Sequence, residues 1–275
     1  MSAGRLNDLK LSLALAGAGK MGGALLRAWL AQGYDPQLLT VIEPHPSAEI
    51  VNLAGEKAFV LGRPSHPPQI LVLAMKPQSL DEAAADLDSL VEQGTLIISI
   101  LAGKTFAALA RRLPRPRAIV RAMPNLPAAV GRGITALTAN PAVTEPQRQA
   151  AEVLLGAAGR VEWLGDESLI DAATAVSGNG PAYVFYLAET LADAGTALGL
   201  PAEVAARLAR ATVEGAGELL FQTPAASAAE LRQKVTSPGG TTAAALEILM
   251  AEDGFAPLME RALRAAKRRA EVLAG

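Results

Sequence analysis

The sequence predicts an α/β domain built on a doubly wound, mostly parallel sheet, followed by an all-α domain. Short apolar runs alternate with helical patterns up to about residue 165, and a glycine-rich loop follows the first of these runs. Beyond that point only Ala- and Leu-rich helical patterns occur. Strands that alternate with helices are typical of parallel sheets with helices on both faces. We therefore expect domains at residues 1–165 and 166–275.

The expected strands of the α/β domain are continuous apolar runs, as in sheets that are covered on both faces. They lie at 11–16, 39–43, 70–75, 95–101, 117–123 and 133–139. Helical patterns fall between several of them, at 20–32, 80–92 and 104–113. The first helix is supported by the i, i+3, i+4, i+7 spacing of Gly22, Leu25, Leu26 and Trp29.

The second domain contains helical patterns and no convincing strand. The helices are expected at 181–199, 201–222, 227–235, 242–253 and 255–273. Pro181 and Pro201 suit first helical turns, and Gly199 suits a helix end.

The composition excludes several classes of function. The chain has 275 residues, a net charge of −2, no cysteine and two histidines. Disulfides, thiolate metal sites and a cysteine nucleophile are therefore excluded, and we expect no metal centre. The chain has no excess of basic residues, so we do not expect it to bind nucleic acid through the phosphates. Because cysteine is absent and histidine is scarce, we expect a protein that borrows its chemistry from a cofactor. No apolar run approaches the ~20 residues of a membrane span, so we expect a cytoplasmic protein.

The glycine-rich loop reads GAGKMG and lies between an expected strand and an expected helix. This G-x-G-x-x-G pattern is the fingerprint of a Rossmann dinucleotide-binding domain. Its first glycine permits a tight turn, its second admits the pyrophosphate, and its third lets the helix pack on the strand. The alternative is a turn with a structural role alone. The residues expected to bind cofactor here are Gly17, Ala18, Gly19, Lys20, Met21 and Gly22.

Glu43 ends the second expected strand, about twenty residues beyond the glycine loop. An acid at this position bonds the ribose 2′-OH and repels a 2′-phosphate, which favours NADH over NADPH. His45 and Ser47 follow closely and are able to accept a phosphate, so the preference stays open. A solvated Glu at a strand end is the alternative.

Two further strand ends offer cofactor contacts, because doubly wound sheets bind ligands at the carboxyl ends of their strands. The segment ILAG supplies Ala102, beside a glycine that lets the nicotinamide ring approach the backbone. The other segment is AMKPQ, residues 74–78, and the alternative interpretation of its lysine is a solvated loop residue. The residues expected to bind cofactor in AMKPQ are Ala74, Met75, Lys76 and Pro77.

The segment SPGGTT, residues 237–242, contains no ionisable side chain. Two glycines and a proline before two threonines and an apolar run predict a turn that starts a helix near Thr242. Taken alone, an ordinary Ser/Thr N-cap is the simplest interpretation of this segment.

Together these motifs resemble the pyrroline-5-carboxylate reductase family. The similarity is carried by DAATAVSGNGPAYVFYLAETLADAG (171–195), GLP (199–201) and LRQKVTSPGGTTAAAL (231–246), with GAGKMG, LAMKPQ and RAMPNLP (121–127) before them. The resemblance implies reduction of the C=N bond of 1-pyrroline-5-carboxylate to L-proline by NADPH or NADH. It also implies a Rossmann domain followed by an all-α dimerisation domain, which forms homodimers and, in some members, rings of dimers.

The resemblance implies roles for single residues as well. Thr242 would lie beside the ring nitrogen of the substrate as the candidate catalytic proton donor, although a hydrogen bond or a relay to water is physically easier for a hydroxyl. The backbone N–H groups of residues 239–240 and the helix start suit the substrate carboxylate. Glu167 matches an acidic position near the substrate in some members, and a first-turn helix acid is its alternative. The expected substrate-binding residues are Ser237, Gly239, Gly240, Thr241, Thr242 and Glu167.

Two other functions compete with this one. A 3-hydroxyacid dehydrogenase of similar two-domain build would carry a catalytic lysine in its helical domain, where Lys234 directly precedes the threonine segment. A non-catalytic dinucleotide-binding protein would keep the fold and bind cofactor without turnover.

Overall fold

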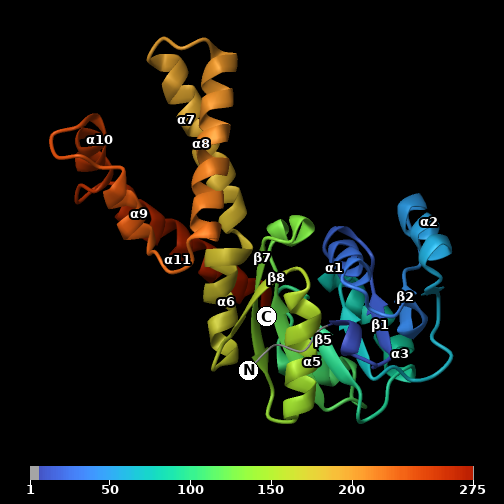
Figure 1. The fold of residues 1–275 in the computed structure, drawn as a ribbon. Helices are drawn as coiled ribbons and strands as arrows, with labels where there is room; N and C mark the ends of the chain where they lie inside the picture. The colour runs from blue at the N-terminus through green and yellow to red at the C-terminus, as the bar shows by residue number, and fades with distance from the viewer. Residues whose placement is uncertain (1–5, 275) are drawn as a thin grey trace. The chain divides into compact units, whose positions relative to one another are not determined.

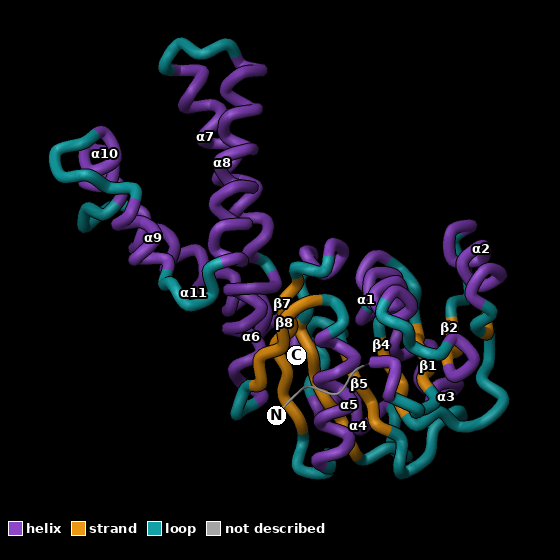
Figure 2. Tube along the Cα trace, in the orientation of Figure 1, coloured by secondary structure: helices purple, strands orange, loops and turns teal. Residues whose placement is uncertain are grey.

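The computed structural model describes residues 6–274 and divides into two compact units. Unit 1 runs to Gly178 and also takes in the chain from Lys267 onward, and unit 2 comprises Asn179–Ala266. All described strands lie in unit 1, and unit 2 is built from helices and loops (Figure 1, Figure 2). The domain limits of 1–165 and 166–275 stay a prediction.

Unit 1 is built on an eight-stranded sheet in the order β3-β2-β1-β4-β5-β6-β7-β8. The strands are β1 (Leu13–Ala16), β2 (Leu39–Ile42), β3 (Val60–Leu61), β4 (Ile70–Leu73), β5 (Leu96–Ser99), β6 (Ala118–Met123), β7 (Gly133–Ala139) and β8 (Gly159–Trp163). Every neighbouring pair is parallel except β6 and β7. The first six strands follow the 3-2-1-4-5-6 order of dinucleotide-binding sheets. The predicted doubly wound, mostly parallel sheet is thus confirmed.

Alternate residues of the central strands face opposite sides of the sheet and enter separate hydrophobic clusters. In β1, Leu13 and Leu15 join one cluster, whereas Ala14 and Ala16 join the other. The first cluster receives residues of α1 (Lys20–Ala31), α2 (Ala48–Lys57) and α5 (Glu145–Gly156), and the second receives residues of α3 (Leu80–Ser89) and α4 (Phe106–Arg112). Helices therefore cover both faces, which explains why the strands are apolar throughout.

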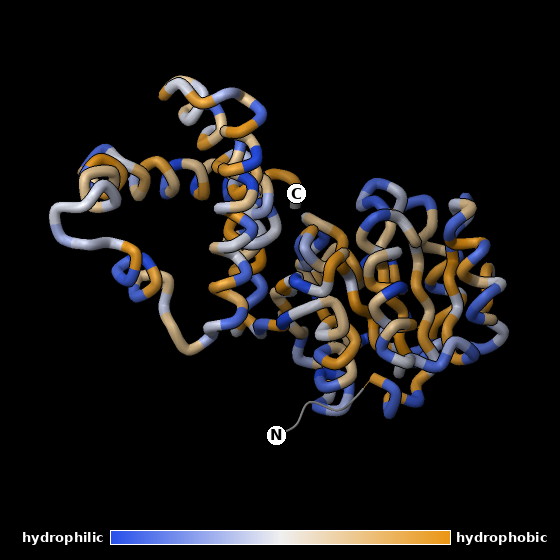
Figure 3. Tube along the Cα trace, turned by 45° about the horizontal axis from the view of Figure 1, so that its top comes forward, coloured by the Kyte–Doolittle hydropathy of each residue, from blue (hydrophilic) through white to orange (hydrophobic). Residues whose placement is uncertain are grey.

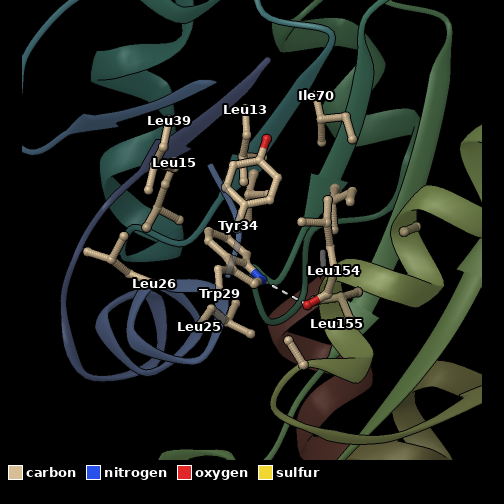
Figure 4. Packing of buried hydrophobic residues seen from close by; sticks show 14 of the residues in the cluster. Leu13, Leu15, Leu25, Leu26, Trp29, Tyr34, Leu39, Ile70, Leu154 and Leu155 are labelled. Atoms are coloured by element: carbon tan, nitrogen blue, oxygen red, sulfur yellow. Dashed lines mark hydrogen bonds between the residues drawn. The ribbon is translucent and has the colours of Figure 1, made fainter. Parts of the chain in front are cut away.

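Trp29 of α1 is fully buried in the first cluster, where its indole N–H donates to the carbonyl oxygen of Leu154 at 2.8 Å (Figure 4). Nearby, the Tyr34 hydroxyl donates to the carbonyl oxygen of Leu11, and burial raises the pKa of Tyr34 well above its ordinary value. Both aromatic side chains thus bury an apolar body while keeping a polar partner. The indole contact ties α1 to α5 inside the core.

The sequence pattern did not predict β3, α2 or α5. The strand β3 is two residues long and is not buried, and α2 buries only Ile50 and Ala54. Neither element therefore shows a strong periodic pattern of apolar residues in the sequence. Local capping nonetheless marks both helices. Ser47 accepts the N–H of Ile50 at the start of α2, and Thr144 begins α5 with a capping box.

A short helical segment leads from β8 to the start of unit 2. It consists of a 3-10 turn (Glu167–Leu169), α6 (Ile170–Ala173) and a π-helical turn (Thr174–Gly178). Asp166 caps the first turn, since its carboxylate accepts the N–H of Ser168 at 2.7 Å. The pattern used for the second domain predicted helix only from residue 181 onward, so this segment was missed.

Unit 2 contains five helical elements. They are α7 (Gly180–Ala197), α8 (Ala202–Gln222), α9 (Ala228–Lys234), α10 (Thr241–Leu249) and the larger part of α11 (Phe255–Ala274). Helices α7 and α8 lie side by side (Figure 1). Gly199 ends α7 as expected, with φ +98°. Its N–H donates to Thr196 at 3.0 Å, and the N–H of Leu200 donates to Gly195 at 3.2 Å, which is a Schellman motif.

Two details of unit 2 differ from the predictions. Pro201 is the N-cap of α8 rather than a first-turn residue, with an extended backbone that a residue before a helix adopts. Helix α10 ends at Leu249 instead of 253, because the chain turns there, with the N–H of Gly254 bonded to the carbonyl oxygen of Ala251 at 2.9 Å.

Unit 2 buries few side chains within one chain. Among its residues, all of them described, only Ala205 and Ala209 of α8 are buried. In Figure 3 apolar residues recur along its helices, and many are exposed. The large exposed ones include Val184, Phe185, Tyr186, Leu191, Leu208, Leu220, Ile248, Leu249 and Leu258. Exposed apolar surface of this extent marks an interaction site. No helix within residues 6–274 combines the length and the apolar character needed to span a membrane.

Candidate functional site

The predicted cofactor residues of unit 1 follow the ends of four neighbouring parallel strands. The last paired residues of β2, β1, β4 and β5 are in register with one another, namely Ile42, Ala16, Leu73 and Ser99. The loops after these strands therefore open at the same edge of the sheet. Doubly wound sheets bind ligands at this edge, where the strand order reverses, and here that point lies between β1 and β4.

Gly17 and Gly22 are required by close packing in the glycine loop. Gly17 has φ +97°, and a Cβ there would lie 2.6 Å from the backbone nitrogen of Met75. A Cβ at Gly22 would lie 2.1 Å from the carbonyl oxygen of Gly17. The N–H of Gly17 also donates to Ile42 at 2.9 Å, which fixes the loop to β2. The tight turn and close helix packing that the motif predicts are both present.

Gly19 differs from the other two glycines, because a Cβ placed on it meets no atom within 4 Å. The first hydrogen bond of α1 runs from the N–H of Gly23 to the carbonyl oxygen of Gly19 at 2.7 Å. The N–H groups of Lys20, Met21 and Gly22 precede that bond and have no partner within the helix. Open space over a glycine beside such N–H groups fits a pyrophosphate, so the residues present fit a dinucleotide.

The Glu43 carboxylate lies against the same loop. Its Oε2 atom accepts the N–H of Ala18 at 2.9 Å, and its Oε1 atom accepts the N–H of His45 at 3.2 Å. The side chain is half-buried at the end of β2 and has a fixed position. Each carboxylate oxygen has a further lone pair, so ribose hydroxyls can still be bound.

The segment AMKPQ begins at the sheet edge, since the N–H of Ala74 donates to the carbonyl oxygen of Ala16 at 2.7 Å. Met75 packs against the second hydrophobic cluster and is only partly exposed. Lys76 is exposed and caps a 3-10 turn, Pro77–Ser79, so its ammonium group is available to a ligand.

Ala102 lies in a tight turn directly after β5. The turn is closed by the N–H of Lys104, which donates to the carbonyl oxygen of Leu101 at 3.3 Å. Gly103 has φ +73°, a left-handed conformation that few other residues adopt. Ala102 is exposed, so this turn presents backbone and a methyl group at the ligand edge.

An ion pair that the sequence did not predict lies near this turn. Arg121 of β6 is buried, and its Nη1 atom donates to Glu167 Oε1 at 2.6 Å. The same oxygen accepts the N–H of Phe106, the first residue of α4, at 2.7 Å. The predicted role of Glu167 in substrate binding stays a prediction, and its carboxylate is engaged by two donors of unit 1. No local sequence signal pairs residues that lie 46 positions apart.

The threonine segment forms a tight turn followed by a helix, all within unit 2. The N–H of Gly240 donates to the carbonyl oxygen of Ser237 at 3.0 Å, and Gly239 has φ +69°. Pro238 and Gly239 thus occupy the two central positions of a turn that requires a positive φ at the second. A Cβ at Gly240 would lie 2.5 Å from the Ser237 hydroxyl oxygen, so a larger residue there would force that hydroxyl to rotate away.

Helix α10 begins at Thr241, one residue before the predicted start, and Gly240 is its N-cap without a capping side chain. Its first hydrogen bond runs from the N–H of Ala244 to Gly240 at 3.2 Å. The N–H groups of residues 241–243 precede that bond, and Thr242 is partly exposed beside them. Backbone donors and a hydroxyl at a helix start are suited to a small carboxylate.

Lys234, the candidate catalytic lysine of the competing dehydrogenase, lies at the end of α9. It lines a surface hollow of about 570 Å³ together with Ala225, Ala226, Glu230 and Gln233. Glu230 is occupied in the capping box of α9, where hydrogen bonds from the Ser227 backbone and hydroxyl lower its pKa. The hollow includes no residue of the SPGGTT segment.

Two family profiles match the chain. The profile described as pyrroline-5-carboxylate reductase dimerisation matches residues 167–273. The profile described as NADP oxidoreductase, coenzyme F420-dependent, matches residues 12–103. The first therefore covers unit 2 and the segment leading to it, and the second covers the glycine loop and the strand ends that follow it.

Relatives match along nearly the whole chain. Pyrroline-5-carboxylate reductases of Pseudomonas aeruginosa and of a Synechocystis species are 40% and 39% identical, over 95% and 96% of this chain and 96% and 99% of their own lengths. A solved pyrroline-5-carboxylate reductase from Coxiella burnetii has a TM-score of 0.88 at 34% identity, covering 96% of this chain and 99% of its own. A Plasmodium falciparum pyrroline carboxylate reductase solved with NADP bound has a TM-score of 0.77 at 26% identity, covering 97% and 99%.

Proposed function

The chain belongs to the pyrroline-5-carboxylate reductase family, and we propose that it reduces the C=N bond of 1-pyrroline-5-carboxylate to L-proline, the last step of proline biosynthesis. The observation that carries this proposal is the 40% identity over 95% of the chain, which includes both the glycine loop and the threonine segment. The enzyme is thus an oxidoreductase that uses NADPH or NADH.

The proposed reaction requires few ionisable side chains from the protein. The nicotinamide cofactor, when bound, supplies the hydride, so the protein must hold and orient the two reactants. The loop at 17–22 offers N–H groups to the pyrophosphate, Lys76 offers a cation, and Ala102 offers a close backbone approach. This division of roles agrees with the absence of cysteine and the scarcity of histidine in the sequence.

The substrate is a cyclic imine that carries a carboxylate. The N–H groups at the start of α10 suit that carboxylate. The N–H of Gly240, which the sequence predicts to join them, instead closes the turn on Ser237. Thr242, with Thr241 and Ser237 beside it, supplies a hydroxyl for the imine nitrogen. A hydroxyl is a weak acid, so Thr242 acts more readily by hydrogen-bonding the nitrogen, or by relaying a proton from water, than by giving up its own proton.

Glu43 favours NADH as the working cofactor. Its carboxylate is anchored by Ala18 and His45, and a 2′-phosphate at this position would meet its negative charge. NADPH remains a usable cofactor at lower efficiency in this proposal.

The second copy of the chain is the partner that unit 2 requires. A helical unit with two buried side chains lacks a core of its own, and its exposed apolar residues need a cover. A homodimer formed through unit 2, alone or as part of a ring of dimers, supplies that cover. We place the enzyme in the cytoplasm, in keeping with a cofactor-dependent biosynthetic reaction.

Steady-state kinetics on 1-pyrroline-5-carboxylate, with NADH and NADPH side by side, test the proposal. We expect turnover with both cofactors and a higher kcat/KM with NADH. Activity on a 3-hydroxy acid with none on pyrroline-5-carboxylate would favour the dehydrogenase, in which case Lys234 becomes the residue to replace. Cofactor binding without oxidation of NAD(P)H would instead indicate a non-catalytic protein.

A further inference from the structure

We propose that Arg121 and Glu167 are positioning residues, which hold the Leu101–Lys104 turn in the place where it supports the nicotinamide end of the cofactor. The inference rests on the proposed function, because that function assigns the turn after β5 to the nicotinamide. It gives Glu167 a role different from the substrate contact that the sequence suggests.

The geometry joins three segments of unit 1 at one carboxylate oxygen. Glu167 Oε1 accepts Arg121 Nη1 at 2.6 Å and the backbone N–H of Phe106 at 2.7 Å. Arg121 belongs to β6, Phe106 begins α4, and Glu167 begins the segment that leads to unit 2. A charged acceptor makes both hydrogen bonds stronger than neutral ones.

The Leu101–Lys104 turn is held at its two ends by different contacts. At its start, the N–H of Ile100 donates to the carbonyl oxygen of Leu73 at 3.0 Å, so the sheet fixes the chain there. At its end, Thr105 caps α4 through the N–H of Ala108 at 3.1 Å, and the adjacent Phe106 N–H is held by Glu167. Loss of the carboxylate therefore frees the end of the turn while its start stays fixed.

Burial distinguishes this pair from the ion pair that joins α3 to the end of α4. The Arg121 side chain is 6% exposed and that of Glu167 is 30% exposed. By contrast, Arg112 pairs with Asp81 at side-chain exposures of 26% and 58%. Exposed pairs contribute little, whereas a buried charge that loses its partner is strongly unfavourable, so the position of Glu167 is well determined by Arg121.

The test compares Arg121→Met, Glu167→Gln and the double variant, with Asp81→Asn as the matched control. Asp81 belongs to α3 and pairs with Arg112 at the end of α4, whereas Glu167 accepts the N–H at the start of α4. Cofactor Kd is measured by nucleotide fluorescence in the absence of substrate, and kcat and KM are measured with it. We expect each single variant to lower kcat about tenfold or more and to raise the Kd for NADH, because a displacement of an ångström is costly at a reacting site. The double variant should be no worse than either single one, since both remove the same contact. Asp81→Asn should change neither quantity.

Three results would overturn the proposal. If Glu167→Gln raises the KM for pyrroline-5-carboxylate alone and Arg121→Met does not, Glu167 contacts substrate. If the variants lower the melting temperature but keep kcat and cofactor Kd, the pair is only structural. Additive effects in the double variant would show that the two residues act separately. Arg121→Lys, which keeps the buried charge but loses the planar fork, replaces Arg121→Met if that variant does not fold.

The cofactor measurements stand apart from the proposed reaction. Fluorescence titration needs no substrate, so a failed assignment of pyrroline-5-carboxylate leaves the Kd comparison intact. If the wild-type enzyme turns over pyrroline-5-carboxylate but the variants keep the normal Kd for cofactor, the proposed function stands and only the positioning role is contradicted.

Discussion

The Oε2 atom of Glu43 accepts the backbone N–H of Ala18 at 2.9 Å, so the acid at the end of β2 is anchored to the glycine loop itself. The second oxygen is held by the N–H of His45 at 3.2 Å. The carboxylate cannot swing away from an incoming 2′-phosphate without breaking both bonds. We therefore infer that selectivity between the two nicotinamide cofactors depends on the same loop that is predicted to bind their pyrophosphate.

Replacing Glu43 by Ser is expected to shift the preference toward NADPH. The substitution removes the negative charge and leaves a hydroxyl that can donate to phosphate, so the NADPH-to-NADH ratio of kcat/KM should rise about tenfold or more. Glu49→Gln is the control, since Glu49 is an exposed acid of α2 that pairs with Arg27. An unaltered ratio in the Ser variant would show that Glu43 does not read the ribose.

Replacing Gly22 by Ala is expected to abolish tight cofactor binding and to destabilise unit 1. The new Cβ would lie 2.1 Å from a backbone oxygen that cannot move without shifting the loop. Overpacking of this kind costs about 1–3 kcal/mol of unfolding free energy. Gly55→Ala is the matched control, because a Cβ there meets nothing within 4 Å on a helix where alanine is preferred. Cofactor titration and thermal unfolding check both; equal behaviour of the two variants would contradict the packing argument.

Replacing Thr242 by Ala is expected to lower kcat more than it weakens cofactor binding. If the hydroxyl only hydrogen-bonds the imine nitrogen, the loss is about tenfold, whereas a proton donor would be worth about a hundredfold or more. Thr242→Ser keeps the hydroxyl and should retain most of the activity. Unchanged kcat in the Ala variant would remove Thr242 from the mechanism.

The stability of unit 2 should depend on protein concentration. Because a partner that binds only the folded state stabilises by mass action, a hundredfold dilution should lower dimer stability by about 2.7 kcal/mol. Phe185→Asp, at a side chain 60% exposed on α7, should dissociate the dimer, whereas Val130→Asp, 73% exposed in unit 1, should not. Sedimentation velocity on both variants gives the answer, and a dimeric Phe185→Asp protein would place the interface elsewhere.

Local patterns in the sequence predicted most of unit 1 and the loops of the site. The motif GAGKMG could be recognised because close packing requires glycine at Gly17 and Gly22. SPGGTT could be recognised because a positive φ at Gly239 and the start of a helix favour that order of residues. The ends of β2, β1, β4 and β5 could then be brought together by the topology of parallel sheets alone.

What the sequence did not reveal depends on contacts between distant residues. The antiparallel direction of β7 leaves no mark on its apolar run, and α2 and α5 bury stripes too narrow to stand out. The residues around Arg121 predict only a strand, and none of them indicates a contact between Arg121 and Glu167. The weak core of unit 2 was hidden as well, because its Ala- and Leu-rich helices have the same composition whether a neighbour lies in the same chain or in another.

The placement of the aromatic side chains has a spectroscopic consequence. The chain has two tryptophans, and both Trp29 and Trp163 lie in unit 1. Trp29 is fully buried, whereas the Trp163 ring is stacked beneath the Arg148 guanidinium, 3.7 Å from the ring centroid. Tryptophan emission therefore follows the unfolding of the dinucleotide-binding part alone, while far-ultraviolet circular dichroism follows the helices of both units. The gap between the two melting curves measures how far the units unfold as one, without any label or substitution.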